Sequence, residues 1–168
     1  SPDHFAQSKL IFENAAATHA NTHAIVDGGS AILLASSKGA ENASTKPLGR
    51  ILGYSIVGVA PERIADSSVA AIRSLLTKIK LNVSNIDLYE INETFAAQLL
   101  IGLKELSLPE EKVNVNGGGV ALGHPFGATG PRLIHTLLKE LRRRSQKRGI
   151  ASICVGGGTG VAVAVETI

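Results

Sequence analysis

The chain has 168 residues, of which 44% are hydrophobic and 18% charged, so it is rich enough in apolar residues to fold around one sizeable core. The formal net charge of +3 is too small to favour nucleic acid as a partner, and no apolar run is long enough to cross a membrane. A single cysteine, Cys154, excludes an intrachain disulfide and fits a reducing compartment, so we expect a cytoplasmic protein. The opening residues SPDHFAQSKL resemble neither a signal nor a transit peptide and lack Met, which favours a part of a longer chain.

The first part of the chain holds one expected strand and one linker. The apolar run Ala31–Ala35 predicts a buried strand. The small, polar stretch GAENASTKP, which ends at Pro47, is the most linker-like segment. We therefore expect an N-terminal segment and linker over residues 1–45 and a domain over residues 46–168.

Strands and helices alternate after Pro47. Short apolar runs predict strands over residues 49–61, 85–91, 112–116, 150–155 and 160–165. Helical spacing of apolar residues predicts helices over residues 65–82, 92–106 and 131–144. The order βαβαβαββ predicts an α/β fold, with a five-stranded mixed sheet and helices packed on it. The glycines between the last two strands predict an antiparallel hairpin.

The glycine-rich stretch NGGGVALGHPFGATG is not a phosphate-binding loop. A Walker loop needs Lys and a hydroxyl where His124 and Pro125 stand. A dinucleotide-binding pattern begins in GGGTG, but Val163 replaces its third glycine. Both patterns fail at the residues that do the binding, which argues against a nucleotide-binding module.

Two residues with the chemistry for proton transfer lie next to glycine. His124 follows a predicted strand and a glycine turn, so it is either structural or presented for proton transfer near neutral pH. Cys154 ends an apolar strand, where a thiol is usually a small buried hydrophobe. Its alternative is a reactive thiol beside Gly156 and Gly157, whose N–H groups could bind an oxyanion.

A third polar residue, Asn92, lies where a predicted strand becomes a helix. It could be the helix N-cap, with Glu93 in the first turn suited to the helix dipole. The carboxyl ends of strands in open α/β sheets are also where ligands bind. Asn92, His124 and Cys154 all fall at or just past such ends, so we expect one site there.

Three stretches together resemble the thiolase family. NETFA (92–96), GHPFGATG (123–130) and CVGGGTG (154–160) match the family motifs N-E-x-F-A, G-H-P-x-G-x-[ST]-G and C-x-G-G-G-x-G, in that order. The similarity extends from about residue 24 to the end of the chain. Residues 24–36 resemble the end of the family's N-terminal half, and Pro47–Ile168 its C-terminal half.

The resemblance implies a Claisen condensation, or its reverse, on coenzyme A thioesters. His124 would activate a nucleophilic cysteine and help to hold the thioester oxygen. Asn92 would orient a water that completes this oxyanion hole, and Cys154 would move the α-proton of the attacking acyl group. The Gly156 N–H would serve a second oxyanion hole. Substrate contacts would come from four further residues: Phe95, His23, Pro125 and Phe126.

The chain also departs from the family. The family's nucleophile lies in the N-terminal half, whereas the only cysteine here occupies the acid/base position. At THANTHAIVDGG the family usually has T-A-G-N-A-S-G, so His23 stands where a serine approaches the pantetheine, and RIADSSV replaces M-G-x-G-P-V.

Two functions follow from these departures. The first is the C-terminal half of a thiolase acting on acyl-CoA such as acetoacetyl-CoA, inactive alone, completed by the N-terminal half of the same protein and a homo-oligomer when whole. The second is a non-catalytic thiolase-like protein that binds acyl-CoA or lipid. Neither needs a metal or a cofactor apart from the coenzyme A thioester itself, and neither involves nucleic acid or a membrane.

Overall fold

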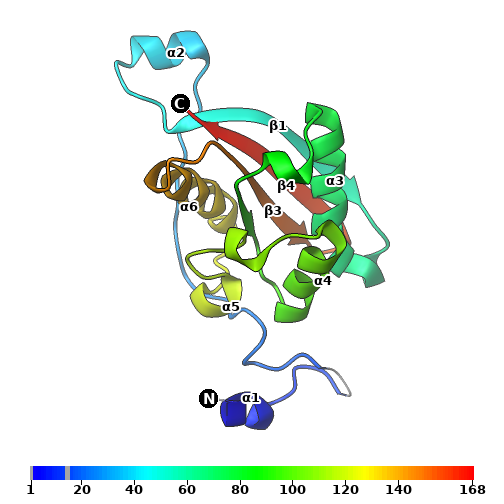
Figure 1. Cartoon of the computed structure of the whole chain (residues 1–168). Coiled ribbons are helices and arrows are strands. Elements are labelled where there is room, and N and C mark those ends of the chain that lie inside the picture. The colour runs from blue at the N-terminus through cyan, green and yellow to red at the C-terminus, as the bar shows by residue number, and fades with distance from the viewer. Residues whose placement is uncertain (1, 14–15) are drawn as a thin grey trace.

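A four-stranded mixed sheet forms the centre of the computed structural model, which describes residues 2–13 and 16–168 (Figure 1). The strands lie in the order β1-β4-β3-β2. β1 and β3 run antiparallel to β4, whereas β2 runs parallel to β3. The bounds of the strands are β1 Gly49–Gly58, β2 Leu88–Ile91, β3 Arg148–Val155 and β4 Thr159–Thr167. Because β2 and β3 are parallel neighbours, the residues after them emerge at the same edge of the sheet.

Helices cover both faces of this sheet. α3 (Ser67–Ile79) and α4 (Ala96–Leu106) lie on one face, and α6 (Thr129–Arg143) lies on the other (Figure 1). Short elements connect them: α1 Pro2–Gln7, α2 Ser37–Asn42, η1 Pro61–Asp66, η2 Val83–Asn85, η3 Glu110–Lys112 and α5 Gly119–Leu122. In the part of the chain that the structure describes, no helix has the length and apolar character needed to span a membrane.

Two hydrophobic clusters hold these layers together, because successive side chains of a strand point to opposite faces. Tyr89 of β2 packs with Ile72 of α3 on one face. Its neighbour Leu88 packs with Leu137 and Leu141 of α6 on the other. Each such side chain contributes about 1.5–3 kcal/mol when fully buried. The predicted layered α/β architecture is confirmed.

The sequence correctly predicts the three long helices, but it is wrong about the start of α4. This helix begins at Ala96, with Phe95 as an N-cap whose side chain makes no capping hydrogen bond. The Asn92 N–H instead donates to Ser152 O at 2.8 Å, which keeps residue 92 beside β3. The Glu93 carboxylate accepts from the Val120 N–H at 3.0 Å, at the start of α5 rather than of α4. Neither residue acts as the helix cap that the sequence suggests.

The predicted fifth strand over residues 112–116 is absent, so the sheet has four strands. Val113 makes only an isolated parallel bridge with Tyr89. Asn114 then adopts a left-handed backbone, with φ at 46°, which interrupts the extended conformation of a strand. Its side-chain amide takes over the pairing, since Oδ1 accepts from the Ile91 N–H at 2.8 Å and Nδ2 donates to Ile91 O at 2.9 Å.

The predicted buried strand over Ala31–Ala35 is also wrong. These residues form no strand, and all of them are exposed, Leu33 to 91% and Leu34 to 70%. The expected linker starts inside the helix α2, which covers its first residues from Gly39 to Asn42 and whose N-cap Ser36 accepts a hydrogen bond from the Gly39 N–H. A strand needs a neighbour, and none of the four strands lies beside this run.

The predicted closing hairpin is confirmed, and two of its glycines are required by close contacts. A Cβ on Gly158 would lie 2.3 Å from Val59 O, and its φ of 84° also favours glycine. A Cβ on Gly160 would lie 2.0 Å from Ser67 O. The turn between β3 and β4 therefore packs directly on the backbone that leads from β1 into α3.

Candidate active site

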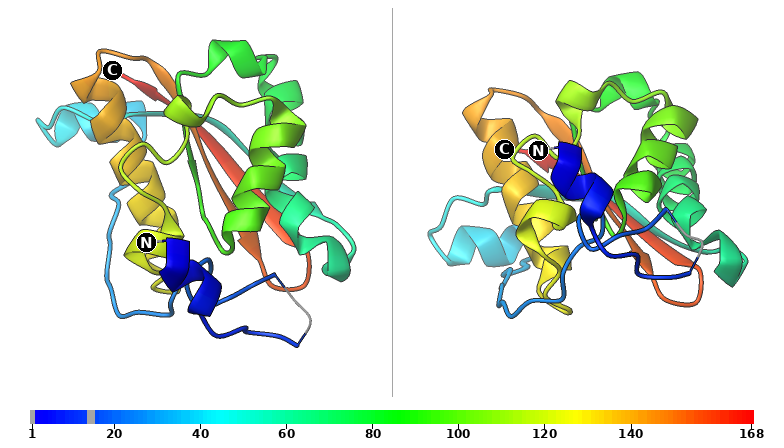
Figure 2. Two further views of the ribbon diagram at one scale, coloured as in Figure 1. Left: turned by 60° about the horizontal axis from the view of Figure 1, so that its bottom comes forward. Right: turned by 90° about the horizontal axis from the view of Figure 1, so that it is seen from below.

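Several segments meet at the carboxyl ends of β2 and β3. Residues 16–31, called the N-terminal stretch below, lie along the end of the molecule that carries α5 and the start of α6 (Figure 2). There the His23 N–H donates to Thr94 O at 3.2 Å, and the His124 N–H donates to Ala24 O at 2.8 Å. Thr22 also forms an antiparallel bridge with Phe95. These backbone contacts place His23 and His124 beside the loop that follows β2.

The His124 ring is held in one orientation by its neighbours. Its Nδ1 lies 2.7 Å from Thr129 Oγ1, and Thr129 Oγ1 donates to Pro125 O at 3.1 Å. The rings of His23 and Phe126 meet it edge-on, at centroid distances of 4.7 and 5.0 Å. Because the only hydroxyl hydrogen of Thr129 goes to Pro125, its oxygen accepts from an Nδ1–H. This tautomer leaves Nε2 with its lone pair, and no described residue hydrogen-bonds to Nε2.

The surroundings of His124 also disfavour its charged form. Burial is the largest cause that lowers its pKa below 6.5, followed by the positive charges of His23 and Arg132. A neutral imidazole with a free Nε2 can take a proton from a donor near neutral pH. The prediction that His124 is presented for proton transfer thus has a physical basis in the structure.

The glycines before His124 leave room for neighbouring segments to pack against this loop. A Cβ on Gly123 would lie 2.6 Å from a methyl of Val26, and its φ is 81°. A Cβ on Gly118 would clash with the Glu93 carboxylate, and one on Gly119 would lie 2.7 Å from Glu93 O. Glycine is therefore needed where this loop meets the segment after β2 and the N-terminal stretch.

Cys154 and Asn92 are joined through Thr94. Cys154 is buried near the end of β3, and its Sγ lies 3.1 Å from Thr94 Oγ1. Asn92 is 1% exposed, and its Nδ2 donates to Thr94 Oγ1 at 3.3 Å. Asn92 Oδ1 is buried and accepts no hydrogen bond from the described residues. Thr94 also contacts His23, so one set of contacts runs from Asn92 and Cys154 to His124.

Four further residues predicted for the site lie around this set of contacts. Gly156 lies in the exposed turn after β3, where a Cβ would meet no atom within 4 Å. Phe95 is half-buried and joins the site through its backbone bridge to Thr22. Pro125 packs closely against Gly28, where an added Cβ would clash with the proline ring. Phe126 lies beside His124 and is 67% exposed.

Sequence reasoning missed Thr94, Thr129, Arg132 and Glu90. Thr129 lies within GHPFGATG, so the motif could have indicated it. Thr94 fills the position that the motif N-E-x-F-A leaves open. Glu90, buried in β2, has its pKa raised to about 7 by burial, with Arg132 opposing the rise and Glu140 adding to it. No sequence pattern indicates this carboxyl, because strands buried on both faces usually read as apolar throughout.

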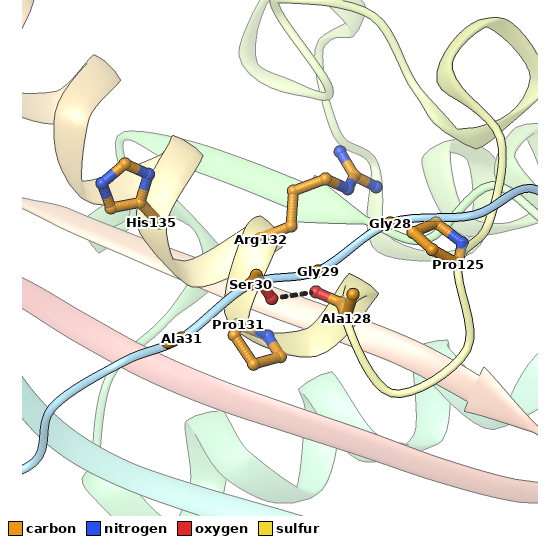
Figure 3. Close-up of a pocket in the computed structure, with 9 residues that line it drawn as sticks. All are labelled: Gly28, Gly29, Ser30, Ala31, Pro125, Ala128, Pro131, Arg132 and His135. Carbon is orange, nitrogen blue, oxygen red and sulfur yellow. Dashed lines mark hydrogen bonds between the residues drawn. The ribbon is translucent and has the colours of Figure 1, made fainter.

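A cavity of about 410 Å³ lies beside this site, where the N-terminal stretch crosses the start of α6 (Figure 3). Arg132 and Pro131 line it from the helix, and Gly28 lines it from the stretch. The Ser30 hydroxyl donates to Ala128 O at 2.6 Å and fastens the stretch to the helix. Within the described residues, no group of three or more His, Cys, Asp or Glu side chains could hold a metal ion.

Comparison with known proteins agrees with this geometry. Residues 45–167 match the family model of the thiolase C-terminal domain. The chain belongs to the thiolase family. The acetyl-CoA acetyltransferase of Chromobacterium violaceum is 46% identical over 99% of this chain and 43% of its own length. The crystal structure of the Bacillus anthracis acetyl-CoA acetyltransferase superposes with a TM-score of 0.96 at 44% identity, over 100% of this chain and 43% of that one.

Relatives from different compartments are about equally similar to this thiolase chain. The cytosolic acetyl-CoA acetyltransferase of Mus musculus is 44% identical over 89% of the chain and 38% of its own length. The peroxisomal 3-ketoacyl-CoA thiolase B of Rattus norvegicus is 42% identical over 96% of the chain and 38% of its own length. The chain thus spans less than half the length of these relatives.

Proposed function

We propose that this chain supplies the acid/base half of a thiolase that makes or cleaves 3-ketoacyl-CoA, such as acetoacetyl-CoA, by Claisen chemistry. The observation that carries the proposal is the connected set of Asn92, Cys154 and His124 at the carboxyl ends of β2 and β3, linked through Thr94 and His23. A Claisen step needs a base at the α-carbon and fixed donors for the enolate oxygen, and these side chains offer both.

In this proposal His124 acts at the nucleophile. Its Nε2 accepts the proton of a cysteine thiol, since Nδ1 is engaged with Thr129. The resulting imidazolium then donates to the thioester oxygen. Burial, which lowers the pKa of His124, makes the protonated ring a stronger acid and favours return of the proton later in the cycle.

Asn92 and Cys154 serve the attacking acyl group. A buried amide oxygen without a partner costs about 1–3 kcal/mol, so Asn92 Oδ1 favours binding of a donor such as water. That water would complete the oxyanion hole. Cys154 Sγ takes the α-proton in condensation and returns it in cleavage. The Gly156 N–H would bind the oxygen of the acyl-enzyme, and Phe95, Pro125 and Phe126 with His23 would border the substrate.

The nucleophile has to come from outside this chain, whose only cysteine is Cys154. We propose that it comes from an N-terminal portion of the same protein, since the relatives named above are more than twice as long. Alone, the chain should have no thiolase turnover. The whole protein should be a cytoplasmic homo-oligomer, in line with its cytosolic relative, although a peroxisomal relative is about as similar.

The experiment uses acetoacetyl-CoA and CoA and follows loss of the Mg-enolate absorbance. The longer protein that carries this chain should turn over, and its His124→Asn variant should lose roughly 10²–10⁴-fold in rate. The isolated chain should match a heat-killed blank. Wild-type-like turnover by the His124→Asn variant would contradict the proposal. If the longer protein binds acyl-CoA but never cleaves it, the alternative of a non-catalytic acyl-CoA-binding protein holds instead.

A further inference from the structure

We propose that Thr94 is a positioning residue whose hydroxyl donates a hydrogen bond to Cys154 Sγ and so stabilises the thiolate of the acid/base cysteine. The inference rests on the proposed function for the role of Cys154, but the hydrogen bond itself can be measured without catalysis. Thr94 lies in the loop between β2 and α4, whereas Cys154 lies near the end of β3, so the contact joins two neighbouring strand ends.

The other partner of the Thr94 hydroxyl leaves its hydrogen available for the sulfur. Thr94 Oγ1 has two side-chain partners, Asn92 Nδ2 at 3.3 Å and Cys154 Sγ at 3.1 Å. An amide nitrogen can only donate, so Asn92 occupies a lone pair of the hydroxyl oxygen. The single hydroxyl hydrogen of Thr94 is then free to point at the sulfur. The S–H group is only a weak donor and a thiolate has no hydrogen to give, so in the proposed arrangement Thr94 donates and the Cys154 S–H points elsewhere.

The loop fixes the hydroxyl in this position. Thr94 O accepts from the His23 N–H at 3.2 Å, and the Thr94 N–H donates to Gln98 Oε1 at 3.2 Å. Gln98 is 3% exposed, so this anchor is shielded from water. With both backbone groups held, the β-branched side chain has few χ1 rotamers in which to leave the sulfur.

A fixed donor at the sulfur matters because the thiol changes charge during the reaction. In cleavage, the bond between the α-carbon and the 3-keto carbon breaks, its electron pair takes the thiol proton to form a C–H bond, and the S–H electron pair stays on sulfur. In condensation, the thiolate takes the α-proton to form S–H, and the C–H electron pair becomes the enolate that forms the new C–C bond with the acyl carbon. A donated hydrogen bond is stronger to the anion than to the neutral thiol, so Thr94 favours the thiolate.

The test measures the alkylation rate of Cys154 in the isolated chain, where it is the only thiol. Thr94→Val keeps the shape but removes the hydroxyl, and Thr94→Ser keeps the hydroxyl. With a small neutral alkylating reagent at fixed neutral pH, Thr94→Val should react about threefold to tenfold more slowly than wild type, because the lost thiolate outweighs the gain in intrinsic reactivity. Thr94→Ser should react at nearly the wild-type rate. Thr77→Val is the matched control, because Thr77 is exposed and, among the described residues, its hydroxyl bonds only Arg73 O.

A wild-type rate in Thr94→Val would overturn the inference, and so would equal slowing in the Val and Ser variants. The infrared S–H stretch of the wild-type chain, identified by its loss in Cys154→Ala, is a second readout that needs no Thr94 variant. It should lie where a thiol that donates no hydrogen bond absorbs. A band shifted to lower frequency would mean that the thiol donates to Thr94, which reverses the proposed direction. None of these outcomes depends on turnover, so the inference and the proposed function can fail separately.

Discussion

Replacing Glu90 with Gln should change how the stability of this chain depends on pH. Glu90 is 2% exposed in β2, and its carboxyl makes no hydrogen bond to the described residues. Burial raises its pKa from 4.5 to about 7, despite the opposing charge of Arg132. The native state therefore binds a proton more tightly than the unfolded state does. The stability that this proton provides is fully present below pH 4.5 and is lost as the pH rises through 7.

The rise in pKa sets the size of the effect. A change from 4.5 to about 7 corresponds to about 3 kcal/mol once both states are ionised. Between pH 5 and pH 8 the wild-type chain should lose about 2–3 kcal/mol of unfolding free energy through Glu90, and Glu90→Gln should lose none of it. Groups that do not interact with Glu90 titrate alike in both proteins and cancel in the comparison.

Urea unfolding followed by circular dichroism at pH 5, 6.5 and 8 measures this difference. Glu111→Gln is the matched control, because it removes a carboxyl from the exposed surface. The control should follow the wild-type profile, whereas Glu90→Gln should be flatter. Parallel profiles for wild type and Glu90→Gln would refute the claim that burial keeps this carboxyl protonated.

Three further predictions concern the site and its surroundings. Histidine ¹⁵N NMR should find His124 as the Nδ1–H tautomer, with a pKa below 6.5. Thr129→Val should weaken the preference for this tautomer by about 2–10-fold. A protonated Nε2 in the neutral wild-type ring would contradict this prediction. Gly160→Ala should lower the free energy of urea unfolding by about 1–3 kcal/mol, because its Cβ would meet Ser67 O. Gly156→Ala should leave this free energy nearly unchanged, and equal effects of the two substitutions would refute the packing argument. Because Leu33 and Leu34 are exposed, the isolated chain should self-associate or leave residues 24–36 unprotected in hydrogen exchange. A monomer in which residues 24–36 are as protected as residues 150–155 would disprove that expectation.

The sequence predicts the layered architecture well because its signals are local. Helical spacing marks α3, α4 and α6, and glycine between two apolar runs marks the closing hairpin. The missing fifth strand shows the limit. Val113 and Val115 have the alternation of a strand, but the backbone turns at Asn114 and its amide replaces the strand pairing. A side chain that pairs like backbone leaves no signal in a hydrophobic pattern.

The residues of the site also fall into those with a local sequence signal and those without one. His124, Cys154 and Asn92 could be found because they occupy motifs at strand ends. Thr94 could not, because its importance arises only when β2 and β3 lie side by side and bring it within 3.1 Å of the sulfur. The strand expected at Ala31–Ala35 failed for the opposite reason, since an apolar run becomes a strand only when a neighbouring strand pairs with it.

The most direct test of the account separates the two half-reactions in the longer protein that carries this chain. In its Cys154→Ala variant, radiolabelled acetyl-CoA should still acylate the nucleophile, while condensation to acetoacetyl-CoA should fall by about 10²–10⁴-fold. That result would assign Cys154 to the α-proton and leave the first attack to another residue. Loss of the acyl label in Cys154→Ala, or undiminished condensation, would contradict the role given to this half of the protein.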